Sequence, residues 1–440
     1  MEQAQGKRVL KAGKLSLWQM RAFWSAGILY LFFYFCKYNF GAAIPGMQEE
    51  FGFTDKTAGW VLTAFLWLYA LGQFINGFLG DRYGPKRILI FGAFGGIIVN
   101  VIFAFGGRIA GYVGLGSLTV FIVLWSLNGY FSSMGWAPLC RIVYNWFPEN
   151  RWGTWMGWAN FLCYFGAFLV FPIATFAIKH WGWRAAFIVS PAFLFAMMVV
   201  FLFLGKSSPQ DAGLETEWEE RQDTEKPARR TGAREYWLAF TNSRMNISYL
   251  CGVGLNFVRW GLLSWGVKIF VAPVVEGGFG LDLMTAGWVT AMASLGGAIM
   301  SVLLGTISDC VFKGIRWQTI TIASLASAAA IFFIAQGAPI LSISILGVRV
   351  GLFLLFIAMF FGGGLIQGAQ TPLFNLPGDI LGKEMGGTGA GIMDGWLYLG
   401  AAFAGFFLGG ILDNYGLTQG LMVMAAVSVA SGLLAILIQK

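Results

Sequence analysis

The sequence predicts an all-α membrane protein with twelve transmembrane helices arranged in two pseudo-symmetric halves of six. Of its 440 residues, 57% are hydrophobic and 11% are charged, which leaves too few charges to cover a soluble protein of this length. Apolar runs such as 88–105, 185–204 and 421–438 approach the roughly 20 residues needed to cross a bilayer. Because spanning segments must satisfy their own backbone hydrogen bonds, these runs are expected to be helices.

Twelve spans follow from this pattern, and the basic amino terminus runs directly into the first, so no cleaved signal peptide is expected. Their predicted limits are 22–46, 58–80, 88–107, 113–138, 152–178, 185–204, 246–273, 285–307, 319–338, 347–372, 387–411 and 418–438. Lys and Arg are concentrated in the amino tail and in the loops on the same side. By the positive-inside rule both termini are cytoplasmic, in a plasma (inner) membrane.

One long polar stretch, 207–235, separates the sixth span from the seventh. It mixes both charge signs and is poor in apolar residues, as a cytoplasmic linker would be. The predicted organisation is therefore an amino tail at 1–21, a first half at 22–204, a linker at 205–244 and a second half at 245–440. The net charge of +8 is spread over short loops, so it reflects topology, and no nucleic-acid partner is expected.

The two halves resemble one another in the loop after their second helix. GDRYGPKR at 80–87 and SDCVFKGIR at 308–316 each place an acid, Asp81 or Asp309, at a helix end before basic residues. Ordinary cation-rich turns are the alternative. These loops and the central linker resemble those of the major facilitator superfamily. The resemblance covers the whole chain. That resemblance implies two six-helix halves that rock around a central cavity, with a cytoplasmic latch assigned to Asp81, Arg82, Arg87, Asp309 and Arg141.

Two cations stand inside predicted membrane helices. Lys37 lies in the first helix of the first half and Arg259 in the first helix of the second, separated by nearly the same interval as the loop acids. A charge at the centre of a membrane helix costs about 2.5–3.5 kcal/mol, and neither has an acid within four residues. Paired repeats bring such residues together near the midplane. The pair therefore indicates an anion site, although pairing with helix carbonyls or a distant acid is the alternative.

Hydrogen-bonding residues accompany both cations at helical spacing. Tyr30 and Tyr34 share a face with Lys37, and Asn256 lies three residues before Arg259. Such groups suit an oxyanion. For the tyrosines, ordinary packing is an equal alternative.

The segments YFCKYNFGAAIP, NGYFSSMGWAPLCRIVYNWF and LNFVRWGLLSW are similar to the organophosphate:phosphate antiporters. The resemblance implies that Lys37 and Arg259 stand where two arginines clamp the substrate phosphate, with Trp136, Tyr34 and Tyr398 as cavity residues. The chain departs from the family at Lys37 itself, and at Tyr38, Gln73 and Cys163, which replace lysine, lysine and histidine. These changes favour a monoanion such as a carboxylate, phosphonate or sulfonate over a dianionic sugar phosphate. The predicted substrate-binding residues are Lys37, Arg259, Tyr30, Tyr34, Tyr38, Trp136, Asn160, Cys163, Asn256 and Tyr398.

Two further charges have open roles. Asp394 lies well inside the eleventh span, where it either carries a proton during transport, balances a cation, or is a carboxyl hydrogen-bonded between helices. Lys268 lies nine residues beyond Arg259, on the opposite helix face, and is expected to snorkel to the outer interface.

We therefore expect a monomeric secondary transporter that moves a small organic anion by alternating access, in exchange for inorganic phosphate. The alternatives are a proton-coupled organic-anion symporter that uses Asp394, and a transporter-like ligand sensor. An enzyme, a cofactor and a metal are not expected, because no catalytic or metal-binding constellation is visible and the single histidine, His180, lies in a loop. The five cysteines form no disulfide framework and no metal spacing.

Overall fold

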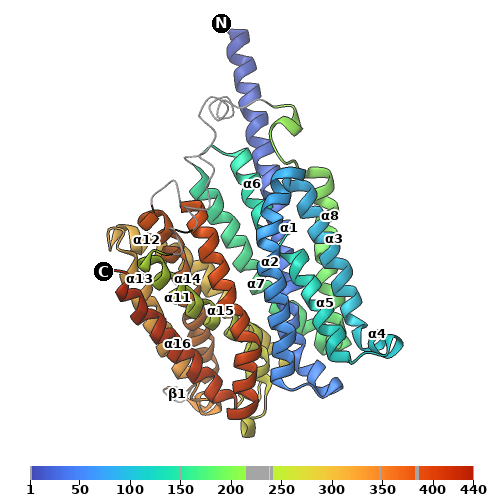
Figure 1. The fold of residues 1–440 in the computed structure, drawn as a ribbon, viewed down its shortest axis with the longest axis vertical. Helices are drawn as coiled ribbons and strands as arrows, with labels where there is room; N and C mark the ends of the chain where they lie inside the picture. Colours follow the sequence, from blue (N-terminus) through green and yellow to red (C-terminus); the bar gives the residue numbers. More distant parts are fainter. Residues whose placement is uncertain are drawn as a thin grey trace.

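The computed structural model describes residues 2–148, 151–214, 237, 241–345, 348–381 and 386–439. The first half contains α1 (Glu2–Phe51), α2 (Asp55–Tyr83), α3 (Pro85–Ala104), α4 (Gly106–Val113), α5 (Ser117–Ser132), α6 (Trp136–Trp146), α7 (Trp152–Trp181), η2 (Trp183–Ala185) and α8 (Ala186–Leu204). The predicted amino tail does not form a separate segment, because α1 begins at Glu2 and continues into the first span. In Figure 1 this end of α1 projects beyond the other helices.

The second half contains α11 (Ser243–Val271), η4 (Val274–Glu276), α12 (Leu283–Cys310), α13 (Arg316–Ile334), η5 (Ala338–Ser342), α14 (Gly351–Leu381), α15 (Gly386–Tyr415) and α16 (Leu417–Leu437). A short helix, η3 (Gln210–Ala212), begins the linker, and most of the predicted linker lies outside the described residues. In the described chain the only strands are β1 (Ser344–Ile345) and β2 (Val348–Arg349), which pair as a small hairpin. The prediction of an all-α protein is confirmed.

Ten helical segments of the described chain are long and apolar enough to cross a membrane, and the predicted fourth span is formed by α5 and α6 together. The second and seventh predicted spans are helices too, α2 and α11, each with 29 residues. They are not among the ten segments, and α11 carries three cations, Arg244, Arg259 and Lys268. A helix of this length extends about 43 Å, so both are long enough to span. Asp55 of α2 and Lys268 of α11 pair across the interface between the halves.

The two halves lie side by side, with the blue-to-green half beside the yellow-to-red half (Figure 1). We call the end where α8 finishes and α11 begins the linker end, and the opposite end, with the α1–α2 and α11–α12 loops, the far end. Towards the far end α2 packs on α15 so closely that a Cβ on Gly59 would collide with the backbone of Gly405. Small residues allow such contact between membrane helices. The Thr63 hydroxyl donates to the Ala402 carbonyl at 2.9 Å across the same contact.

Ionic contacts close the far end. Lys268 pairs with Asp55 of the other half, and Asp55 is 3% exposed. Asp413 of α15 accepts from the backbone N–H groups of Asp55 at 2.7 Å and Lys56 at 2.6 Å, at the first turn of α2. The expectation that Lys268 snorkels to the interface was therefore wrong. Its partner is a carboxylate on the other half of the protein. Spacing along a single helix could not reveal such a partner.

A buried asparagine network holds α1 around Lys37. Asn39 donates to Asn100 at 2.9 Å, Asn100 donates to Asn128 at 2.9 Å, and Asn128 donates to the Cys36 carbonyl at 2.7 Å. All three amides are fully buried. Because hydrogen-bonded buried amides are costly to break, α1 is anchored to α3 and α5 on both sides of the lysine.

The residues of the predicted latch are only partly described. Asp309 pairs with Arg316, which also pairs with Asp379 at 3.0 Å, so this cluster joins α12, α13 and α14 within one half. Arg87 and Arg141 are exposed. The side chains of Asp81 and Arg82 lie outside the described part. A latch between the halves stays a prediction.

Candidate functional site

The Lys37 ammonium lies in an aromatic cage. It lies 4.1 Å from the ring centre of Tyr69, 4.8 Å from that of Tyr34 and 6.0 Å from that of Tyr30, and Lys37 is 4% exposed. Ring faces attract cations, and the attraction is strongest where water is excluded. The predicted grouping of Tyr30 and Tyr34 with Lys37 is confirmed. Tyr69 was missed, although it lies one helical turn before Gln73 of the same predicted span.

Arg259 is held by a different set of groups. Its guanidinium lies 5.2 Å from the ring centre of Tyr164, and its Nη1 donates to Gln370 Oε1 at 3.1 Å. The amide of Gln370 donates to Asn256 at 3.2 Å, and Asn256 donates to the Leu397 carbonyl at 2.6 Å. Within the described residues Arg259 Nε is buried and has no hydrogen-bond partner. Asn256 therefore supports the arginine through Gln370, and one donor of the guanidinium is unpaired in the described chain.

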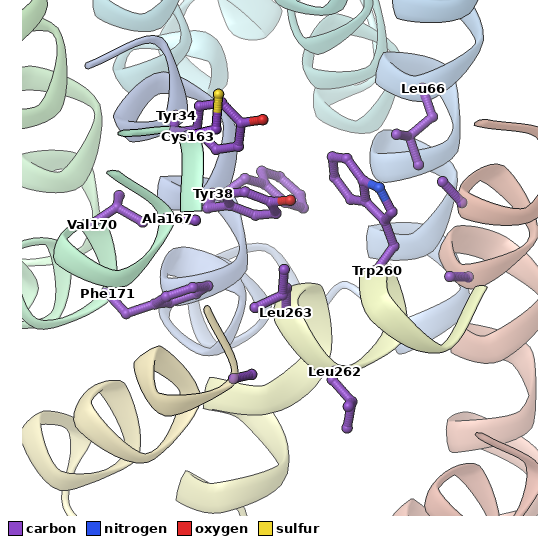
Figure 2. Packing of buried hydrophobic residues seen from close by; sticks show 14 of the residues in the cluster. Tyr34, Tyr38, Leu66, Cys163, Ala167, Val170, Phe171, Trp260, Leu262 and Leu263 are labelled. Atoms are coloured by element: carbon purple, nitrogen blue, oxygen red, sulfur yellow. The ribbon is translucent and has the colours of Figure 1, made fainter. Parts of the chain in front are cut away.

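An aromatic layer joins the halves next to the two cations. Tyr38, which follows Lys37, lies against Trp260, which follows Arg259, with ring centres 5.1 Å apart. Phe171 packs on the other side of Tyr38 at 6.0 Å. Figure 2 shows Tyr38 between Phe171 and Trp260, with Tyr34 and Cys163 close together above it. This layer separates the cations from the far end.

The backbones of α1 and α11 meet just beyond this layer. A Cβ on Gly41 would lie 2.9 Å from the carbonyl oxygen of Ser264. That close approach requires glycine, and it leaves no passage between the two helices at this level.

Asp394 is an acid that lies near enough to interact electrostatically with both cations. It forms no ion pair within 4 Å in that part of the chain, and it is half-buried. The site therefore holds two cations and one acid, a net charge of +1 when all three are ionised. That net positive charge suits a bound anion. No group of the described chain already takes the place of such an anion.

The other predicted site residues surround this centre. Trp136 packs on Tyr30 at 5.9 Å, and Tyr398 packs on Tyr69 at 4.6 Å across the two halves. The Cys163 thiol interacts with the Tyr34 hydroxyl. Asn160 is exposed and lies on α7 one turn before Tyr164, whose ring contacts Arg259, and its part in the site stays a prediction.

Sequence reasoning did not identify Tyr69, Tyr164, Gln370 and Trp260. Tyr164 and Trp260 directly follow two predicted substrate-binding residues, Cys163 and Arg259. Their positions in the sequence were therefore a signal that could have identified them. Gln370, an amide within a glycine-rich span, carried the weaker signal of a polar group in an apolar helix. In the described residues there is no group of three or more His, Cys, Asp or Glu side chains that could hold a metal ion.

Comparison with known proteins extends over most of the chain. Residues 26–403 match the family described as the Major Facilitator Superfamily. A probable hexose phosphate transport protein of Chlamydia pneumoniae is 24% identical over 430 residues, covering 92% of this chain and 87% of that protein. The glycerol-3-phosphate transporter of Bacillus subtilis is 26% identical and covers 92% of this chain and 89% of its own length.

A sensor and a solved structure are also similar. The membrane sensor protein UhpC of Escherichia coli is 26% identical, covering 96% of this chain and 91% of that protein. The crystal structure of a D-xylose-proton symporter matches with a TM-score of 0.71 at 15% identity, covering 94% of this chain and 97% of that one. At that identity the structural match establishes the shared fold.

Proposed function

The chain belongs to the major facilitator superfamily, and from that premise we propose that it moves a small organic anion across the membrane in exchange for inorganic phosphate. The observation that supports this most is the pair Lys37 and Arg259. They come from the first helix of each half, Lys37 is buried and Arg259 half-buried, and in the described chain neither has a carboxylate within ion-pair distance.

The energetics favour a ligand at this pair. Cation–π contacts are worth about 2 kcal/mol where water is excluded, which offsets only part of the cost of burying Lys37. The unsatisfied Nε of Arg259 adds to that cost. An oxyanion between the cations provides charge-assisted hydrogen bonds to both. The guanidinium suits bidentate recognition, and the ammonium acts as a single charge.

The cost of holding two cations without an anion also explains why exchange is proposed. A carrier whose two halves each hold a buried cation resists closing while empty, and an anion shared by the cations draws the halves together. The far end is closed by Lys268, Asp55 and Asp413, so the anion would enter from the linker end. With both termini in the cytoplasm, this is the inward-facing state of a monomeric inner-membrane carrier.

The net charge of the site limits the classes of substrate that fit it. The hexose phosphate and glycerol-3-phosphate transporters to which the chain is similar support an organophosphate or a similar phosphorylated metabolite. Asp394 lowers the net charge of this site, and Gln73 and Cys163 add none. We therefore propose an anion that carries a single negative charge when bound.

Counterflow tests the proposal. Proteoliposomes loaded with phosphate would be given labelled phosphate without a pH gradient, for the wild type, Lys37→Ala and Arg259→Ala. The control is Arg108→Ala, which removes an exposed cation from α4. We expect exchange in the wild type and the control and at least tenfold less in both site variants. Normal exchange in the site variants would refute the clamp.

A proton-coupled organic-anion symporter is the second candidate, favoured by the position of Asp394 near both cations. It predicts uptake driven by an imposed pH gradient with no internal anion, and loss of that drive in Asp394→Asn. A ligand sensor, which the similarity to UhpC supports, predicts anion binding with neither exchange nor pH-driven uptake.

A further inference from the structure

An apolar groove with a volume of about 410 Å³ lies between α2 and α15, on the side of the molecule where the two halves meet. Its walls include Leu66, Trp67, Ala70 and Leu71 of α2 and Tyr398 and Leu399 of α15. No charged side chain of the described chain lines it. The volume falls in the range of small-molecule pockets, which combine apolar walls with a few convergent polar groups.

The groove opens sideways. Trp67 is 51% exposed and Leu71 is 52% exposed, so its mouth lies on the surface that faces the bilayer. Both residues lie on α2, one turn apart, beside the half-buried Ala70.

The inner wall of the groove borders the cation site. Tyr398 lines the groove, and its ring lies 4.6 Å from that of Tyr69. Tyr69 in turn contacts the Lys37 ammonium, which lies 4.1 Å from its ring centre. A single layer formed by these two tyrosines therefore separates the apolar space from the charge. Rotamer changes at both Tyr398 and Tyr69 would join the two spaces, and Tyr398 is already partly exposed.

We propose that the groove receives the apolar alkyl or aryl part of an amphiphilic substrate monoanion whose acidic head lies between Lys37 and Arg259. The inference rests on the proposed function for the head group and extends it to the substrate class. An apolar space beside an anion site fits one molecule with both properties. A sugar phosphate would place hydroxyl groups against walls that offer few hydrogen-bonding partners, which is costly.

The test is equilibrium binding to the purified protein by calorimetry, using the phosphonate series from methylphosphonate to hexylphosphonate. For the wild type we expect each methylene to tighten binding by about two- to fourfold. Ala70→Trp, which fills the groove, is expected to bind methylphosphonate as the wild type does and to lose the dependence on chain length. Leu71→Trp, at the mouth, is a second variant in case Ala70→Trp does not fold.

Ala329→Trp is the matched control, because Ala329 is exposed on α13, away from the groove. It should keep the chain-length dependence. Equal affinity along the series in the wild type would overturn the inference, as would a dependence that survives both filling variants or is lost in the control. Release of a co-purified lipid by Ala70→Trp, with the phosphonate series unchanged, would assign the groove to a lipid acyl chain instead.

Binding does not depend on exchange, so the two proposals fail in different ways. Absence of phosphate counterflow with an intact chain-length dependence removes the exchange function and keeps the groove assignment. Absence of binding for the whole series, methylphosphonate included, removes the head-group site and the groove assignment with it.

Discussion

The ammonium of Lys37 lies 4.1 Å from the centre of the Tyr69 ring, so this lysine of the proposed anion site is covered by an aromatic face from α2. This contact explains how an empty carrier tolerates the charge. It also links the two halves, because Tyr69 packs on Tyr398.

The contact can be measured with a double-mutant cycle. Tyr69→Leu and Lys37→Met would be made singly and together, and thermal stability would be followed without ligand. We expect a coupling of about 1–2 kcal/mol, as for a desolvated cation–π pair. Tyr69→Phe keeps the ring face and should retain most of the coupling energy. Additive effects would contradict the contact.

The far-end ion pair predicts a specific pattern of stabilities. Lys268→Met leaves Asp55, 3% exposed, without its cation, and Asp55→Asn leaves the lysine without its anion. Breaking a buried pair is more costly than replacing both partners. Because the Lys268 side chain is 18% exposed, we expect each single variant to lose about 1–3 kcal/mol of stability. The double variant should lose less. A double variant that is the least stable of the three would exclude this role.

The asparagine network predicts an effect on the anion site at a distance. Asn128→Ala removes the donor to the Cys36 carbonyl and leaves buried groups unpaired, which costs about 1–3 kcal/mol. Because α1 then loses an anchor beside Lys37, anion affinity should fall as well. Asn145→Ala, which removes a contact to the Ser207 carbonyl near the linker end, is the control and should leave affinity unchanged. Equal losses of affinity in the two variants would argue against positioning.

The cap of α12 predicts a dependence on pH. Asp282 accepts from the Thr285 hydroxyl and from the N–H groups of Thr285 and Met284, and these bonds lower its pKa below 3.8. A lowered pKa stabilises the fold above pH 3.8, and the contribution disappears as pH falls through the folded-state pKa. Asp282→Ala should cost about 0.5–2 kcal/mol at neutral pH. The difference from the wild type should shrink in acid, which thermal unfolding across pH 3–7 would measure; a constant difference would contradict it.

Much of the architecture could be predicted from composition and spacing, because a bilayer permits few structures. Long apolar runs must be helices, so twelve spans were predicted from hydropathy, and ten helical segments of the described chain are long and apolar enough to cross a membrane. The α2 and α11 helices were predicted as spans as well, but the contact that Lys268 makes with Asp55 of the other half was not. That Lys37 and Arg259 form one site stays a prediction, made because a repeat places equivalent residues near one axis.

The sequence by itself determined the helical membrane fold and the presence of buried cations, because hydropathy and charge are local properties that read directly from residue types. The tertiary structure alone decided which groups meet those cations. Tyr69, Tyr164 and Gln370 come from three helices distant in sequence, and Lys268 finds Asp55 across the two halves. Such contacts depend on the rotation and register of packed helices, which arise from side-chain shape over the whole interface and are not encoded at any one position.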